Sequence, residues 1–165
     1  MNKILFVCTA NVCRSPMAEA IFNTLAEDAR LPLRAESAGL HALRGELMAG
    51  DARAVLAELG IRTREHRARQ LEARMLEDAA LVLTMNTQHA AEIRRIFGDP
   101  DYKVFTLPEY AGGGTGQKEI SDPYGHTRTA FRASARQIVE YVDMLVTILS
   151  SRQRTRAQTA PGDAR

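Results

Sequence analysis

Short apolar runs alternate with longer amphipathic stretches along most of the chain. Runs of branched apolar residues between turn-forming ones predict buried strands at residues 4–7, 33–36, 80–85 and 104–107. Apolar residues at helical spacing predict helices at residues 16–29, 48–59, 87–97 and 127–149. Strands that alternate with helices predict a single-domain α/β fold, a doubly wound four-stranded parallel sheet with flanking helices.

The two ends of the chain differ in composition. Residues 1–150 contain all the predicted elements, so we expect them to form one domain, whereas the polar residues 151–165 are predicted to be a disordered basic tail. The tail carries four Arg and one Asp, so the formal net charge of +2 for the whole chain leaves −1 for residues 1–150. The basic balance therefore does not indicate a nucleic-acid partner.

The beginning of the chain and its cysteines bear on location. Met1-Asn2-Lys3 leads directly into a strand that is too short for a leader or a membrane span. The only two cysteines, Cys8 and Cys13, are five residues apart, which is unlike a disulfide framework. We therefore expect a cytoplasmic protein without membrane insertion.

The segment that follows the first strand carries the clearest chemistry. It reads Cys8-Thr9-Ala10-Asn11-Val12-Cys13-Arg14, then Ser15-Pro16 at the start of the first predicted helix. The N–H groups of such a loop and the positive end of a helix can converge on a dianion. The spacing Cys-x5-Arg lets a thiolate face a phosphorus atom while the guanidinium binds two of its oxygens. The predicted phosphate-binding residues are Thr9, Ala10, Asn11, Val12, Cys13, Arg14 and Ser15.

This loop resembles that of the low-molecular-weight protein tyrosine phosphatases of bacterial type, which reads Cys-x5-Arg-Ser/Thr-Pro. The resemblance extends over residues 3–149 and includes the segments 36–39, 66–70, 81–85 and 122–124. It implies a phosphatase domain that hydrolyses phosphotyrosine through a cysteinyl-phosphate intermediate, without a cofactor. It also implies that Ser15 donates a hydrogen bond to the leaving sulfur, although Ser15 could instead cap the helix.

The nucleophile is expected to be Cys8, because only Cys8 has an arginine at the sixth following position. The loop N–H groups, the helix end and Arg14 should favour its thiolate. Asn11 is expected in the left-handed region, which Asn tolerates better than most residues. The resemblance implies that Ser37 and His66 hold Asn11 in place.

Asp122 is the predicted general acid, since an aryloxide leaving group benefits from a proton. The glycine-rich residues 112–116 before it predict a mobile loop. Tyr124 should form one wall of the cleft, and Leu40, with the residues up to Leu43, the opposite wall.

Three rival classes and one competing activity within the family fit less well. A non-catalytic phosphate-binding module would keep Arg14 yet could lose Cys8 or Asp122, and both are present. A nucleotide-binding loop would need Gly-Lys-Ser/Thr where this chain has Cys13-Arg14-Ser15. Thioredoxin-coupled arsenate reductases of this fold relay a disulfide through later cysteines, and none follows Cys13. Protein-arginine phosphatases of the same family have Thr where this chain has Val12, so Val12 favours phosphotyrosine. The implied partner is a phosphotyrosine protein, such as a tyrosine autokinase of polysaccharide export.

Two further expectations concern metals and redox control. The remaining histidines, His41, His89 and His126, lack the spacing of metal ligands, so no metal is predicted. Cys13 lies on the same loop as Cys8, and a disulfide between them would protect the nucleophile from over-oxidation. The alternative is that Cys13 only packs beneath the loop.

Overall fold

The computed structural model describes residues 3–113 and 119–159. Most of the glycine-rich segment 112–116 and the last six residues of the predicted tail lie outside this description. The elements are, in order, β1 (Lys3–Cys8), α1 (Arg14–Asp28), β2 (Arg34–Gly39), α2 (Gly50–Glu58), α3 (Ala73–Asp78), β3 (Leu81–Thr84), α4 (Thr87–Phe97), β4 (Val104–Thr106), α5 (Leu107–Ala111) and α6 (Arg128–Thr159).

The four strands form one parallel sheet in the order β2-β1-β3-β4. This confirms the predicted doubly wound sheet, with β1 between β2 and β3. The chain leaves β1 toward one edge and later crosses to the other, which places a topological switch point at the carboxyl end of β1. Cys8 is the last residue of that strand.

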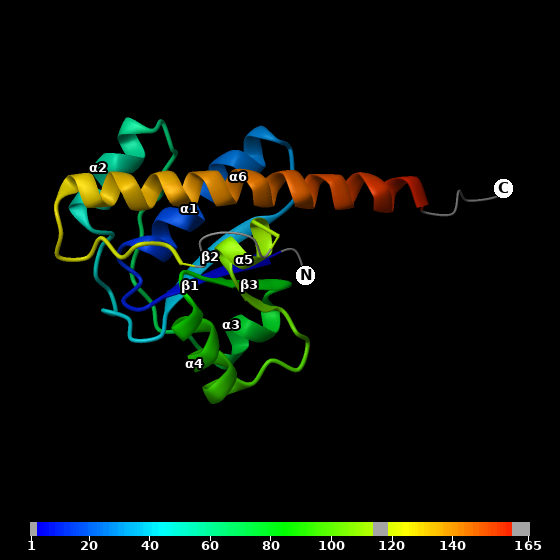
Figure 1. Cartoon of the computed structure of the whole chain (residues 1–165), viewed down its shortest axis with the longest axis horizontal. Helices are drawn as coiled ribbons and strands as arrows, with labels where there is room; N and C mark the ends of the chain where they lie inside the picture. Colours follow the sequence, from blue (N-terminus) through cyan, green and yellow to red (C-terminus); the bar gives the residue numbers. More distant parts are fainter. Residues whose placement is uncertain (1–2, 114–118, 160–165) are drawn as a thin grey trace.

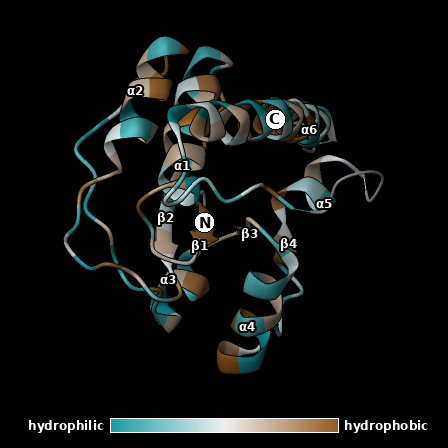
Figure 2. Cartoon of the chain, turned by 60° about the vertical axis from the view of Figure 1, so that its left-hand side comes forward, coloured by the Kyte–Doolittle hydropathy of each residue, from teal (hydrophilic) through white to brown (hydrophobic). Residues whose placement is uncertain are grey.

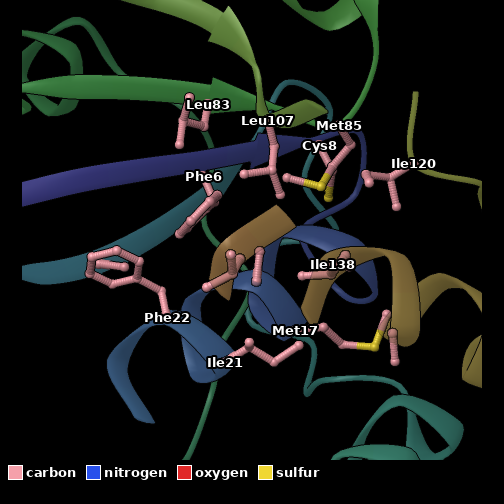
Figure 3. Close-up of a cluster of buried hydrophobic side chains, with 14 of the residues drawn as sticks. Phe6, Cys8, Met17, Ile21, Phe22, Leu83, Met85, Leu107, Ile120 and Ile138 are labelled. Carbon is pink, nitrogen blue, oxygen red and sulfur yellow. The ribbon is translucent and has the colours of Figure 1, made fainter. Parts of the chain in front are cut away.

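Helices cover both faces of the sheet. α1, α2 and α6 pack on one face, and α3 and α4 lie on the other (Figures 1 and 2). Alternate residues of β1 point to the two layers: Phe6 and Cys8 join the larger core cluster, whereas Leu5 and Val7 join the smaller one. Figure 3 shows the larger cluster, in which Phe6 packs against Phe22 of α1 with ring centroids 6.1 Å apart.

The last helix is longer than the sequence predicted. α6 continues to Thr159, so residues 151–159 are helical, and the prediction of a disordered tail is corrected for this part. Extending an existing helix requires no new nucleus, and arginine, alanine and glutamine propagate it well. The end of α6 projects beyond the rest of the domain (Figure 1), and Arg152 on it lies over the Tyr110 ring at 5.6 Å.

No helix within the described ranges is long and apolar enough to cross a membrane.

Candidate active site

Hydrogen bonds from neighbouring segments to its carbonyl groups hold the loop after β1 in place. Backbone N–H groups of the segment that follows β2 donate to the carbonyls of Cys8, Thr9 and Ala10, and Ala49 N–H donates to that of Val12, at 2.9–3.1 Å. In a trans peptide the N–H points away from the C=O. The loop N–H groups are therefore directed toward the hollow side, where an anion would lie, together with the first turn of α1.

Asn11 curls this loop and connects it to its surroundings. Its φ is 58°, as expected for the left-handed region. Its fully buried side chain donates to Ser15 Oγ at 2.8 Å and Ser37 Oγ at 3.0 Å, and its Oδ1 accepts from the Arg69 N–H at 3.0 Å. His66 Nε2 donates to the Asn11 carbonyl at 2.7 Å. The structure thus brings together the three residues that the resemblance linked.

A glycine of β2 permits the close approach of the loop. A Cβ on Gly39 would lie 2.5 Å from the Thr9 carbonyl oxygen and 3.1 Å from Asn11 Cβ. Only glycine leaves room for the loop at this point.

The two cysteines differ in environment. Cys8 lines the cleft, with its Sγ 2.9 Å from Ser15 Oγ. Burial, reinforced by the neighbouring Cys8, raises the pKa of the Cys13 thiol to about 12, so Cys13 stays protonated at neutral pH. Ser15 is the second residue of α1 and Cys13 precedes that helix without a side-chain cap, so Ser15 is not its N-cap.

Arg14 and Asp122 meet across the cleft. The Arg14 side chain is only 5% exposed, and its Nη2 lies 3.2 Å from Asp122 Oδ2. Its Nη1 donates to the Ile120 carbonyl at 3.2 Å, while the Ile120 N–H donates to the Met85 carbonyl. Figure 3 places Ile120 beside Met85 and Cys8. The segment that carries Asp122 is thus anchored to Met85, the residue after β3, and Asp122 itself remains 54% exposed, within reach of an entering substrate.

The cleft has a volume of about 290 Å³. Its lining includes Tyr124, His41 and Leu43. Leu40 does not line it, which corrects the prediction: Leu40 is 5% exposed and packs in the smaller core cluster with Leu5 and Val7. Side chains alternate between the two faces of the sheet along β2, and this alternation continues past the end of the strand, so Leu40 points inward.

Sequence reasoning missed two residues near the loop. His89, which it left without a role, lies on α4 with its Nε2 2.9 Å from Thr9 Oγ1. Glu19 of α1 accepts a 2.5 Å hydrogen bond from Ser37 Oγ, and burial raises the pKa of its carboxyl. The position of His89 had a readable signal, because it lies near the start of the predicted helix 87–97, which follows the carboxyl end of the predicted strand 80–85.

No three His, Cys, Asp or Glu residues gather to form a metal site in the part of the chain that the structure describes. The positive groups at the site are instead Arg14 and the N-terminus of α1, which suit a phosphate group.

Comparison with known proteins agrees with this geometry. The family model described as "Low molecular weight phosphotyrosine protein phosphatase" matches residues 3–155. A protein-arginine-phosphatase of Geobacillus stearothermophilus is 37% identical over 92% of this chain and 98% of its own length. The low molecular weight protein-tyrosine-phosphatase Wzb of Salmonella typhi is 37% identical over 80% of this chain and 83% of its own length.

Solved structures show the same similarity. A low molecular weight protein tyrosine phosphatase from T. tengcongensis superimposes with a TM-score of 0.84 at 34% identity, covering 90% of this chain and 99% of that one. A cysteine-to-serine mutant of the YwlE arginine phosphatase, with a phosphorylated active site serine, superimposes with a TM-score of 0.86 at 36% identity, covering 92% and 98%. The chain belongs to the low molecular weight phosphotyrosine protein phosphatase family of hydrolases.

Proposed function

We propose that the protein hydrolyses phosphotyrosine in proteins, with Cys8 as nucleophile, Arg14 as phosphate ligand and Asp122 as general acid. The observation that carries this proposal is the convergence of these three side chains on one cleft. The phosphorylated serine at the active site of the YwlE mutant supports a covalent intermediate in the family.

In the first step the Cys8 thiolate attacks phosphorus, and the bond from phosphorus to the tyrosine oxygen breaks. Arg14 and the loop N–H groups bind the three non-bridging oxygens. Asp122 donates its proton to the departing phenolate oxygen, so that tyrosine leaves neutral.

In the second step water attacks the cysteinyl phosphate. Asp122, now a carboxylate, accepts a proton from that water, and the P–S bond breaks to release inorganic phosphate. The electron pair returns to Cys8 Sγ, where the hydrogen bond from Ser15 Oγ at 2.9 Å stabilises the thiolate.

Val12 supports phosphotyrosine as the substrate. Its side chain is buried and belongs to the lining of the cleft, as does the more exposed Tyr124. An apolar lining suits an aryl ring, whereas a phosphorylated guanidino group buried against it would lose hydrogen bonds to water without replacement. The second candidate is protein-arginine phosphatase, since relatives of that name match over more of the chain than Wzb does.

The two candidates are distinguished by hydrolysis of matched phosphotyrosine and phosphoarginine peptides. We expect the wild type to prefer phosphotyrosine in kcat/KM. Val12→Thr should shift the ratio toward phosphoarginine by about 5-fold or more, since one added hydrogen bond contributes about 1 kcal/mol. Val12→Ile, which stays apolar, should keep the wild-type preference. A wild type that prefers phosphoarginine would establish the second candidate instead.

We further propose that Cys13 protects Cys8 during oxidation. Peroxide would convert the Cys8 thiolate to a sulfenic acid, which the Cys13 sulfur would then attack as it loses its proton, giving a disulfide and water. After peroxide and then a dithiol, the wild type should recover more activity than Cys13→Ser. Equal recovery, with no intramolecular disulfide by mass, would contradict this role.

The proposed protein substrate is a tyrosine autokinase of polysaccharide export, which the resemblance of residues 66–70 and 122–124 to phosphatases of that kind supports. Because turnover needs a reduced Cys8, we place the reaction in the cytoplasm.

A further inference from the structure

His89 is a buried histidine beside the phosphate-binding loop that the reaction above does not use. It is the third residue of α4, and its N–H donates to the capping Asn86 Oδ1 at 2.8 Å, which fixes its backbone. Its side chain reaches Thr9, the residue that follows the nucleophile, with Nε2 2.9 Å from Thr9 Oγ1. This hydrogen bond therefore connects α4 with the loop.

The other ring nitrogen indicates where the proton lies. Nδ1 is buried and has no hydrogen-bond partner among the residues described. Burial and the nearby Arg14 lower the pKa of His89 to about 4, so at pH 7 the neutral ring carries one proton. On Nδ1 that proton would be a buried donor without an acceptor, which is rare in proteins. On Nε2 it bonds Thr9 Oγ1, and Nδ1 keeps only a lone pair near the positive end of α4.

Thr9 is placed to use this arrangement. It lines the cleft that contains Cys8 and Asp122, and also an adjoining polar hollow lined by His41 and Glu92. When Oγ1 accepts a hydrogen bond from His89, its own hydrogen is free to point to another acceptor.

We propose that His89 is a positioning residue, which donates from Nε2 to Thr9 Oγ1 and so directs the Thr9 hydroxyl hydrogen to an oxygen of the bound phosphoryl substrate. This inference rests on the proposed phosphatase function and adds to it a donor that the loop backbone does not supply.

The test compares Thr9→Val, His89→Leu and the double variant in hydrolysis of an aryl phosphate and in binding of orthovanadate. Each single change should lower kcat/KM by about 10- to 150-fold, the effect of one lost hydrogen bond to a charged group. The double variant should be no slower than the slower single variant, because both remove the same interaction. His89→Gln, whose amide can donate to Oγ1, should recover most of the activity. Effects that multiply in the double variant would overturn the proposal.

A matched control is Ile93→Val, a buried residue one turn further along α4 that packs in the smaller core cluster. It reports what weaker packing of this helix does, and it should stay within about 2-fold of the wild type. If His89→Leu fails to fold, the position of the proton on the His89 ring still tests the proposal. ¹⁵N spectra of the wild type should show a neutral ring protonated on Nε2 at pH 7. A ring protonated on Nδ1 would overturn the proposal.

The failure of the proposed function is a separate outcome. A wild type that hydrolyses no phosphomonoester would contradict the phosphatase assignment, and the ¹⁵N spectrum together with the vanadate affinities of the same variants would then decide the role of His89.

Discussion

Replacing Cys8 by serine is expected to abolish turnover while the protein still binds phosphate and vanadate. A serine hydroxyl is a weak nucleophile without a base. Within the described ranges, the side chain that hydrogen-bonds Cys8 Sγ is that of Ser15, and a hydroxyl group cannot act as the base. Arg14, the loop N–H groups and the end of α1 are unchanged, so the anion site remains. We expect kcat to fall by at least about 10⁴-fold, the scale seen when a nucleophile is removed.

The measurement pairs steady-state hydrolysis of an aryl phosphate with calorimetric binding of inorganic phosphate. Mass spectrometry of Cys8→Ser after incubation with substrate should also be recorded, because a stable phosphoryl adduct without release would identify position 8 as the site of attack. Cys8→Ser with nearly wild-type kcat would remove Cys8 from the role of nucleophile.

Cys13→Ser is the matched control, with the same change on the same loop. Its thiol is buried and stays protonated, so its loss should disturb packing beneath the loop but not the attack on phosphorus. We expect a decrease in kcat that is much smaller than that of Cys8→Ser. The opposite order of effects would exchange the roles of the two cysteines.

The fold was predictable where the pattern along the chain was local. Each of the four predicted strands and four predicted helices is present, because burial on both faces of β1 and the apolar stripe of α6 leave a direct trace in the sequence. α3 and α5 were missed because six and five residues are too few for a helical period to show. For α5 a signal was nevertheless present, since Thr106 and Glu109 form a capping box.

The site was predictable where a motif fixes geometry, as in the loop from Cys8 to Ser15. Contacts between distant segments were not. The hydrogen bond between Thr9 and His89 joins residues 80 apart, and nothing local to either indicates the other. Leu40 was assigned to the cleft because it adjoins the wall, but one step of strand alternation separates a core position from His41 at the surface.

Asp122→Asn is expected to slow poor leaving groups far more than good ones. An amide cannot donate the proton that a departing aryloxide needs, whereas an aryloxide of low pKa leaves without it. General-acid contributions are about 10²- to 10⁴-fold, so phenyl phosphate should lose that factor in kcat/KM while p-nitrophenyl phosphate loses much less.

The substitution keeps most of the local structure. Asp122 accepts from the Tyr124 N–H through Oδ1 at 3.2 Å, whereas its Oδ2 lies 3.2 Å from Arg14 Nη2. Asparagine has one oxygen and can retain the first of these contacts, and the lost contact with Arg14 is the same for every substrate. A loss that depends on the leaving group therefore reports proton transfer and not a displaced loop. Asp101→Asn removes the same charge from an exposed carboxylate that pairs with Lys103 just before the amino end of the edge strand β4, whereas the site lies at the carboxyl end of β1. Asp101→Asn should leave kcat/KM unchanged for every substrate of the leaving-group series.

The slope of log kcat/KM against leaving-group pKa is the decisive quantity. In the wild type, protonation by Asp122 compensates for a basic leaving group, so the slope should be shallow. In Asp122→Asn the developing charge on oxygen is uncompensated, so the slope should become steeper. Asp122→Asn could instead lower kcat/KM by the same factor for every substrate and leave the slope unchanged. In that case Asp122 acts only through its ion pair with Arg14, and the proton must come from another group.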